Sequence, residues 1–296
     1  MIRLGAQLSQ AHGFDVVIRE AGSAGLSALQ LFSRNPVGGQ GKSLPPAGSL
    51  KPVLREAGIE RLYIHAPYFV NPAAIDEAMV GRARVALKQE MRRAKRLSGD
   101  YVVLHPGHWQ DKARREESLA AFVDTVAIML EAPGRVLVEN TAGQGRELGA
   151  DFLELQQIFQ GIGRTRRVGL MLDTAHAMAF GYPLSSRDDV ERLLERVDEN
   201  VGIERLQGIH LNDSLYPVGS RRDRHARLLS GCLGREALGA LLRWCDASHC
   251  PLVLETPGRD TIQRQPDIGI IREVCQEESA CVSPSTVFYP TASPPR

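Results

Sequence analysis

One stretch of the chain, from His210 to His225, concentrates side chains that bind metals and phosphates. It holds two histidines and two aspartates within sixteen residues, together with Arg221, Arg222 and Arg224. Imidazole and carboxylate groups together suit borderline divalent metals such as zinc. Guanidinium groups pair with phosphate through two parallel hydrogen bonds. The combination predicts phosphate-ester chemistry on a nucleic acid, with further metal ligands elsewhere in the chain.

Eight short β-type runs alternate with longer helical stretches. The expected strands are Leu4–Leu8, Leu26–Phe32, Arg61–His65, Tyr101–His105, Arg135–Glu139, Gly169–Asp173, Leu206–Leu211 and Leu252–Glu255. The expected helices lie near Asp15–Ala24, Leu50–Ala57, Ala73–Leu97, Glu116–Leu130, Asp151–Gln160, Arg187–Val201, Arg235–Cys245 and Asp267–Gln276. This alternation predicts an α/β protein with a (β/α)8 TIM barrel. A doubly wound open sheet is the alternative, but no Gly-x-Gly-x-x-Gly follows the first strand.

Six consecutive expected strands carry a His, Asp or Glu at or near the carboxyl end. These residues are His65, His105, Glu139, Asp173, His210 and Glu255. Catalytic groups in barrels gather at that end, because the loops that follow the strands open around a common mouth. Three more residues of the same types, His176, Asp223 and His225, follow shortly after strand ends. The pattern therefore predicts nine ligands around one mouth.

Nine ligands are too many for a single catalytic zinc, which takes about three protein ligands and keeps one position open. Nine residues, with some carboxylates bridging, suit two or three clustered metals. Metals about 3.5–4 Å apart activate water and stabilise both oxygens of an in-line displacement at phosphorus. The set predicts a metal-dependent phosphodiester hydrolase. A single histidine is more often a surface or core residue, so His12, His108 and His249 receive no role.

Composition limits the class of protein. The chain has 296 residues, 43% hydrophobic and 24% charged, which suits one barrel domain and a tail. The net charge is +1, so nucleic acid would be bound by a local basic patch. No apolar run reaches about 18 residues and no signal peptide is recognised, so no membrane association is expected. Residues 1–278 are expected to form the barrel, and the Pro/Ser/Thr-rich residues 279–296 a disordered tail.

Five cysteines all fall in the last quarter of the chain. Their odd number and the lack of a Cys-x-x-Cys pair indicate reduced thiols in a cytoplasmic protein. A metal clip of Cys245, His249 and Cys250 is the less favoured alternative to packing roles.

The motifs that carry the nine ligands occur together in one known family. They are Ile64-His-Ala-Pro-Tyr68, Leu104-His-Pro-Gly107, Val138-Glu-Asn-Thr-Ala-Gly-Gln-Gly145, Leu172-Asp-Thr-Ala-His176, His210-Leu-Asn-Asp-Ser214, Gly219-Ser-Arg-Arg-Asp-Arg-His225 and Leu254-Glu-Thr-Pro257. As a set they resemble the endonuclease IV family of apurinic/apyrimidinic endonucleases. The resemblance runs from the first strand to about residue 275. Sugar isomerases share the barrel without this set of motifs.

The resemblance implies three Zn2+ ions, with Mn2+ as the alternative at one site. It implies that His65 and His105 hold the first ion, that Glu139 bridges to a second held by Asp173, His210 and Glu255, and that His176, Asp223 and His225 hold the third. Glu139 and Glu255 are then the catalytic carboxylates. The implied reaction cleaves double-stranded DNA on the 5′ side of an abasic site, leaves a 3′-hydroxyl and trims blocked 3′ ends. A monomer is expected.

The expected DNA contacts lie in the loops at the mouth. The resemblance assigns Tyr68 and Phe69 to a loop that inserts into DNA, where an apolar wedge can unstack a base step; ordinary packing is the alternative. The family's usual Arg, Gln and Trp are absent after Asn35, and Gln7 stands where the family often has His. Arg34, Lys42, Arg221, Arg222, Arg224 and Arg227 are expected to bind phosphates. The basic residues between Arg82 and Arg96 are expected on a solvated helix face.

Three functions stay open at this point. The leading prediction is a zinc-dependent DNA-repair endonuclease that acts at abasic sites. A sugar isomerase or epimerase on the same barrel is disfavoured by the third ligand set, because such sites use one or two metals. A DNA damage-binding protein with weak turnover has only the altered loop after Asn35 in its favour.

Overall fold

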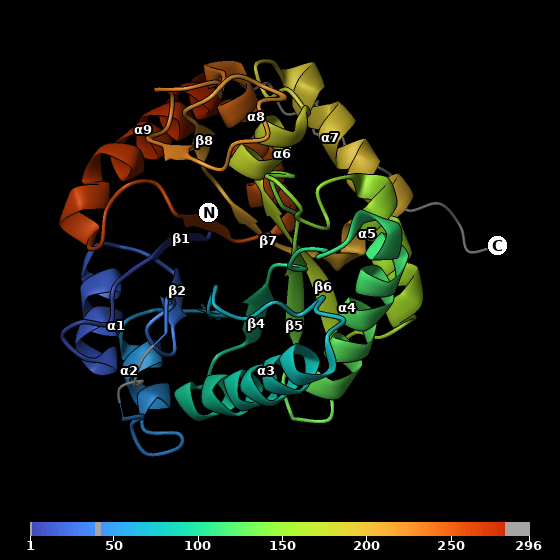
Figure 1. Ribbon diagram of the computed structural model, residues 1–296. Coiled ribbons are helices and arrows are strands. Elements are labelled where there is room, and N and C mark those ends of the chain that lie inside the picture. Colours follow the sequence, from blue (N-terminus) through green and yellow to red (C-terminus); the bar gives the residue numbers. More distant parts are fainter. Residues whose placement is uncertain (1, 39–42, 282–296) are drawn as a thin grey trace.

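The computed structural model describes residues 2–38 and 43–281. Eight parallel strands close into a barrel in the order β1-β10-β7-β6-β5-β4-β3-β2, with the helices on its outside (Figure 1). The strands are β1 Leu4–Gln7, β2 Ala28–Phe32, β3 Arg61–His65, β4 Tyr101–Leu104, β5 Val136–Glu139, β6 Val168–Asp173, β7 Leu206–His210 and β10 Leu252–Leu254. All eight expected strands are present, and the predicted TIM barrel is confirmed.

The long helices of the outer ring also occur where they were expected. They are α1 Phe14–Ser23, α2 Leu50–Glu56, α3 Glu77–Leu97, α4 Arg115–Met129, α5 Phe152–Ile162, α7 Arg187–Asn200, α8 Arg235–Ser248 and α9 Thr261–Cys281. Two short 3-10 turns, η1 Lys112–Arg114 and η2 Ile203–Arg205, lie between elements. In the described part of the chain, no helix combines the length and the apolar character that a bilayer crossing would need.

Helices α3 and α9 differ most from their expected bounds. Helix α3 begins at Glu77 rather than Ala73, because the Asp76 carboxylate accepts a hydrogen bond from the Met79 N–H and caps the first turn. Helix α9 begins at Thr261 rather than Asp267, and it continues to Cys281, three residues into the segment expected as a tail. Residues 282–296, the remainder of that segment, lie outside the described residues.

Two small elements at the carboxyl end of the barrel were not expected. Helix α6, Thr174–Phe180, starts directly after β6, and strands β8, Asp213–Ser214, and β9, His225–Ala226, form an antiparallel pair. The Asp173 carboxylate caps α6 by accepting a hydrogen bond from the His176 N–H. Elements of two to seven residues are too short to show a periodic signal. They carry two of the nine predicted ligands, His176 and His225, and closely follow two others, Asp173 and Asp223.

The alternation of side chains along the strands places the predicted ligands next to a layer of mostly apolar side chains inside the barrel. A cluster inside the barrel contains Ala28, Tyr63, Tyr101, Val103, Leu137, Met171 and Val253. Two residues after Tyr63, Val103, Leu137, Met171 and Val253 come His65, His105, Glu139, Asp173 and Glu255. Because successive side chains point to opposite faces of a strand, residues two apart share the inward face. The strands therefore carry an apolar inner layer followed by a layer of predicted ligands.

Candidate metal centre

The nine predicted ligands converge at the carboxyl end of the strands. Three overlapping groups have ligand atoms that lie within 4.8 Å of one another: His65, His105 and Glu139; Glu139, Asp173, His210 and Glu255; and Asp173, His176 and His225. Asp223 adjoins the third group, since its Oδ1 lies 3.4 Å from His176 Nε2 and 3.5 Å from His225 Nε2. The arrangement offers three adjacent positions for metal ions.

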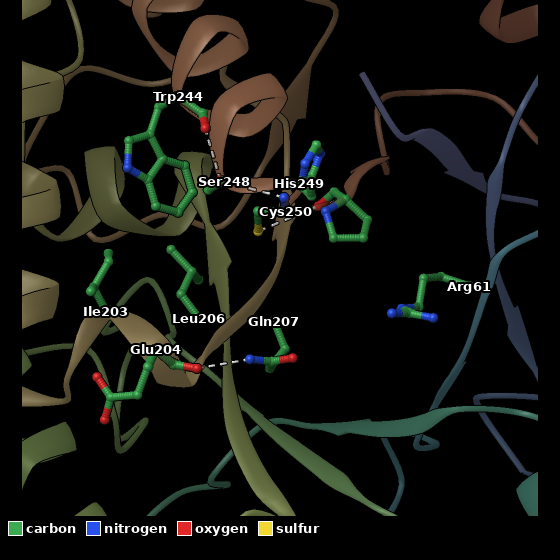
Figure 2. A pocket seen from close by; sticks show the side chains of 10 residues that line it. Arg61, Ile203, Glu204, Leu206, Gln207, Trp244, Ser248, His249 and Cys250 are labelled. Carbon is green, nitrogen blue, oxygen red and sulfur yellow. Dashed lines mark hydrogen bonds between the residues drawn. The ribbon is translucent and has the colours of Figure 1, made fainter. Parts of the chain in front are cut away.

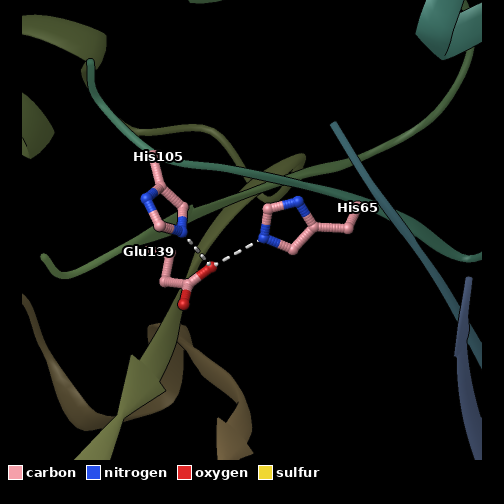
Figure 3. A group of neighbouring side chains, drawn as sticks. All are labelled: His65, His105 and Glu139. Atoms are coloured by element: carbon pink, nitrogen blue, oxygen red, sulfur yellow. Dashed lines mark hydrogen bonds and ion pairs between the residues drawn. The ribbon is translucent and has the colours of Figure 1, made fainter. Parts of the chain in front are cut away.

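Glu139 belongs to two of the groups. Its Oε2 lies 3.2 Å from His65 Nε2 and 3.1 Å from His105 Nε2, and Figure 3 shows both imidazoles directed at this oxygen. The other carboxylate oxygen, Oε1, lies 2.9 Å from His210 Nδ1. A carboxylate with a separate set of imidazoles on each oxygen has the geometry that a bridge between two metals requires.

Two of the five imidazoles are held through their Nδ1 atoms by backbone carbonyls. His65 Nδ1 contacts the Ala66 carbonyl at 2.8 Å, and His176 Nδ1 contacts the Asn140 carbonyl at 2.9 Å. A carbonyl accepts a hydrogen bond only from a protonated nitrogen, so in the neutral ring the opposite nitrogen keeps a free lone pair. Metal-binding histidines in proteins are commonly oriented in this way.

Two asparagines support the ligands and received no role from the sequence. Asn140 accepts a hydrogen bond from the Asp173 N–H at 2.6 Å and donates to the Asp173 carbonyl at 3.0 Å. Asn212 donates to Asp173 Oδ2 at 2.7 Å and accepts from the Glu255 N–H at 2.9 Å. Both asparagines stand one or two residues after a ligand within a quoted motif, which was the available signal.

A glycine and an asparagine hold the loop that follows His105. The Gly107 φ angle is +89°, and an added Cβ would lie 2.2 Å from Asn71 Oδ1. The Asn71 side chain accepts from the His108 N–H at 3.0 Å and donates to the His108 carbonyl at 2.9 Å. The His-Pro-Gly motif therefore needs glycine, both for its backbone conformation and for space.

Asp213, the other aspartate of the stretch from His210 to His225, has a structural role. Its buried carboxylate accepts hydrogen bonds from the backbone N–H groups of Ser214, Gly231, Cys232 and Leu233 at 2.7–2.8 Å. These bonds fasten residues 231–233 against the β8 strand. A carboxylate oxygen already bound by several N–H groups is a poor candidate for a metal ligand.

The donor set fits zinc. It combines five imidazoles with four carboxylates, and such mixed nitrogen and oxygen sets suit borderline divalent metals. Glu139, Asp173 and His210 are fully buried, and carboxylates at this depth need a compensating positive charge. His225 Nε2 is buried without a hydrogen-bond partner, and it lies 3.6 Å from Asp173 Oδ2. A cation between these atoms would satisfy both groups.

The ionisable groups of the cluster shift one another's pKa. Burial raises the pKa of Glu139, but the charges of His210 and His105 outweigh burial and hold this pKa well below its usual value. Burial lowers the pKa of His210, but the carboxylates of Glu139 and Glu255 raise it to about 9. The pKa of His176 is raised well above its usual value, because Asp173 and Asp223 outweigh burial. Without metal, protons supply the positive charge.

Zinc uptake by the metal-free protein is expected to release protons. Zinc binds neutral imidazole. Because pH 7 is below the His210 pKa of about 9, this imidazole is in its doubly protonated, positively charged form at pH 7. Zinc affinity should therefore fall as the pH falls below about 9. Calorimetric titrations at pH 7, in two buffers with different ionisation enthalpies, measure the protons released. Fewer than one proton per protein would contradict the expectation.

The predicted insertion loop lies beside this cluster. The Tyr68 and Phe69 side chains are about half exposed. The Tyr68 ring packs 5.2 Å from the His65 ring and lines a cavity of about 320 Å³, which His105, His176 and Glu255 also line. The DNA contacts of Tyr68 and Phe69 remain predictions.

The arginines between β8 and β9 lie at the exposed edge of the third group. The Arg221 guanidinium lies 5.1 Å from the centre of the Phe180 ring, and that of Arg222 lies 4.2 Å from the centre of the Tyr216 ring. Arg224 donates to the Asp223 carbonyl at 2.6 Å. All three arginines are exposed, so the phosphate contacts predicted for them are sterically open.

Two of the predicted phosphate ligands form ion pairs with buried carboxylates. Arg227 Nη1 lies 3.1 Å from Asp267 Oδ2, and the second such residue is Arg34. Its guanidinium forms an ion pair with the carboxylate of Glu90, which is fully buried on α3. Arg93, expected on a solvated face, instead donates to Ser33 Oγ at 2.8 Å, and Ser33 Oγ donates to Glu90 at 2.5 Å. The solvated position expected for Arg93 is wrong, because the buried Glu90 draws it inward. Lys42 lies outside the described residues.

The residues of the alternative metal clip lie at the opposite end of the barrel. A cavity of about 300 Å³ there is lined by His249, Cys250 and Trp244, with Arg61 and Gln207 at the amino ends of β3 and β7 (Figure 2). Within residues 2–38 and 43–281, Cys245, His249 and Cys250 belong to none of the candidate metal groups.

Comparisons with known proteins agree with this geometry. The family described as "Xylose isomerase-like TIM barrel" matches residues 18–276. A "Probable endonuclease 4" of Moorella thermoacetica is 33% identical over 277 residues, which cover 92% of this chain and 99% of that protein.

Solved structures show similarity to the same kinds of protein. Endonuclease IV from Thermus thermophilus superposes with a TM-score of 0.80 at 31% identity, covering 93% of this chain and 99% of that one. A D-tagatose 3-epimerase-like protein has a TM-score of 0.72 at 18% identity, covering 95% and 100%, a likeness that shows the fold alone. The chain therefore belongs to the endonuclease IV family, within the xylose isomerase-like TIM barrels.

Proposed function

We propose that this protein is a zinc-dependent DNA-repair endonuclease that hydrolyses the phosphodiester on the 5′ side of an abasic site. The product carries a 3′-hydroxyl, and the same site trims blocked 3′ ends. The observation that carries the proposal is the third ligand group, Asp173, His176 and His225, with Asp223 beside it. This group adds a third metal position to the two that the other groups supply.

The proposal assigns protein ligands to each of the three metal ions. His65, His105 and Glu139 hold the first ion; Glu139, Asp173, His210 and Glu255 hold the second; Asp173, His176, Asp223 and His225 surround the third. When bound, the ions lower the pKa of water and stabilise negative charge on the phosphodiester oxygens. The protein's own part is to hold the ligands rigidly, through Asn140, Asn212 and the backbone carbonyls.

The exposed side of the cluster indicates where the phosphodiester would lie. His65, Asp173 and His210 are buried beneath it. Solvent reaches the side chains of His105, Glu255, His225 and Asp223, which are 25%, 11%, 18% and 35% exposed. A phosphate that enters the cavity meets these four residues first. Glu255 is the carboxylate of the second group on this open side, which supports its catalytic role.

The surroundings of the cavity suit duplex DNA. Tyr68 and Phe69 offer apolar surface on one side, and Arg221, Arg222 and Arg224 offer positive charge near the third group. Moving an abasic nucleotide out of the helix costs less than moving an intact one, because no base has to be unstacked or unpaired. Selectivity for abasic sites follows from that difference. The proposal includes a monomeric enzyme acting in the cytoplasm.

A labelled duplex with a single synthetic abasic site tests the proposal. The enzyme should cut the strand immediately 5′ to the abasic site, and a sequencing gel reads the position. The same duplex without the lesion is the control and should stay intact. Elemental analysis should find close to three equivalents of zinc. Binding without a cut would favour the damage-binding alternative, and a cut on the 3′ side would contradict the proposed reaction.

A further inference from the structure

We infer that Gln30 is a positioning residue of the metal centre, which fixes His210 and Glu255 as ligands of one of the three ions. The inference rests on the proposed metal-dependent function. Gln30 lies on β2, in register with Gln7 of β1 and Tyr63 of β3, and its side chain is fully buried. It stands between Leu29 and Leu31, so it is a polar residue in a buried apolar run.

Both ends of the Gln30 amide contact ligands. The Nε2 group donates to Glu255 Oε1 at 2.6 Å, across 225 residues of sequence. The Oε1 atom lies 2.9 Å from His210 Nε2, which donates to it. One side chain thus connects β2 to a ligand on β7 and to a ligand that directly follows β10. A buried amide requires partners of this kind, and here both partners are predicted metal ligands.

The chemistry of the partners determines how the amide is oriented. An ionised carboxylate only accepts hydrogen bonds, so the NH2 end of Gln30 must face Glu255. The carbonyl end then faces His210 and requires a proton on Nε2. In the neutral ring this leaves the lone pair on Nδ1, which lies 2.9 Å from Glu139 Oε1 and 3.4 Å from Glu255 Oε2. Gln30 therefore determines that Nδ1 is the nitrogen with which His210 can bind a metal. It also leaves Oε2 of Glu255 free for metal.

His210 differs from the other anchored histidines in the type of its anchor. His65 and His176 are held by the backbone carbonyls of Ala66 and Asn140, and His225 Nδ1 lies 3.4 Å from the Glu255 carbonyl. A backbone carbonyl is still present after its residue is substituted. The anchor of His210 is a side chain, so a substitution can remove it. Replacing Gln30 should therefore disturb a single ion, the one within reach of Glu139, Asp173, His210 and Glu255.

Two substitutions separate the parts of this role. Gln30→Met keeps similar bulk and removes both hydrogen bonds. Gln30→Glu keeps the size and an acceptor for His210, but it replaces the donor and places a carboxylate beside Glu255. Both variants should bind the affected zinc about 10- to 100-fold more weakly, the loss typical of residues that orient metal ligands. The other two ions should keep their affinities.

A matched control is available in the same barrel. Gln207 of β7 also uses both ends of its amide, since its Nε2 donates to the Glu204 carbonyl at 2.8 Å and its Oε1 accepts from the Tyr101 hydroxyl at 3.0 Å. It lies near the amino end of β7, whereas His210 ends that strand, and it lines the cavity shown in Figure 2. Gln207→Met removes two hydrogen bonds of a glutamine far from the metal centre. It should keep three zinc ions.

The experiment measures zinc that remains after dialysis against a chelator chosen to leave wild type with three equivalents. Both Gln30 variants should retain two equivalents, and Gln207→Met should retain three. Competition with a chromogenic chelator gives the affinities, and the absorption spectra of the cobalt-substituted proteins should lose the contribution of one site. Thermal unfolding of the metal-free proteins reports folding.

Each outcome decides the inference. Three ions held with wild-type affinity in the folded Gln30 variants would overturn it, while abasic-site cleavage by wild type would leave the proposed function standing. A wild-type protein that binds no zinc would overturn both. If Gln30→Glu fails to fold where Gln207→Met folds, Gln30 has a structural role and the inference is also overturned.

Discussion

Replacing Glu255 with glutamine is expected to lower the rate of abasic-site incision by at least about a hundredfold. Binding of duplex DNA that contains an abasic site should stay within a few-fold of wild type. The two side chains have nearly the same size, so the substitution removes a negative charge and little else. The rate is measured in single turnover with a labelled duplex, and the affinity by fluorescence anisotropy.

The position of Glu255 explains why the effect should be large. Its Oε1 is held by Gln30 at 2.6 Å, and its Oε2 lies 3.4 Å from His210 Nδ1. It is the carboxylate of its group that solvent reaches from the cavity, so it stands where the phosphodiester would lie. A glutamine there offers an NH2 group or a neutral oxygen in place of an anionic ligand. Both charge balance and metal binding would suffer at the reacting side.

Glu147→Gln is the matched control for this variant. Glu147 lines the same cavity but belongs to none of the three ligand groups, and its carboxylate accepts a hydrogen bond from the Gln144 N–H at 2.8 Å. The change removes one negative charge from the same mouth without touching a predicted ligand. Incision by this variant should stay within a few-fold of wild type. Wild-type turnover in Glu255→Gln would remove Glu255 from the mechanism.

Metal removal is expected to have the largest effect. Dialysis against a strong chelator should reduce incision roughly a thousandfold or more, because the residues of the cluster would be left without the ions that activate water. The melting temperature should also fall, since ions that bind only the folded state stabilise it. At free zinc about 1,000 times the dissociation constant this stabilisation amounts to about 4 kcal/mol.

Metal replacement provides the control. Zinc added back should restore both activity and melting temperature. Mg2+ should restore neither, because a set with five imidazoles suits zinc, whereas Mg2+ prefers oxygen ligands. Full activity of the stripped protein in the presence of chelator, with metal content verified by elemental analysis, would contradict a metal-dependent reaction.

The sequence by itself determined the barrel and the set of ligand types at its mouth. Apolar runs buried on both faces mark the eight strands, and the alternation along each strand is local. His65 follows Tyr63, and Glu139 follows Leu137, at the two-residue spacing that puts both on the inward face. Since parallel strands of a barrel end at one mouth, the His, Asp and Glu side chains at the strand ends had to meet there.

The tertiary structure alone decided which partner each of these side chains has. Gln30 and Glu255 are 225 residues apart, and no local pattern predicts their hydrogen bond. Nothing in the sequence near Arg34 and Arg93 distinguishes them from arginines on the surface. In the structure both guanidinium groups pair with the carboxylate of the buried Glu90. Such pairs depend on the depth at which a charge is buried and on what lies opposite, because a buried charge must find a partner wherever the chain brings one. Only the closed barrel specifies those distances.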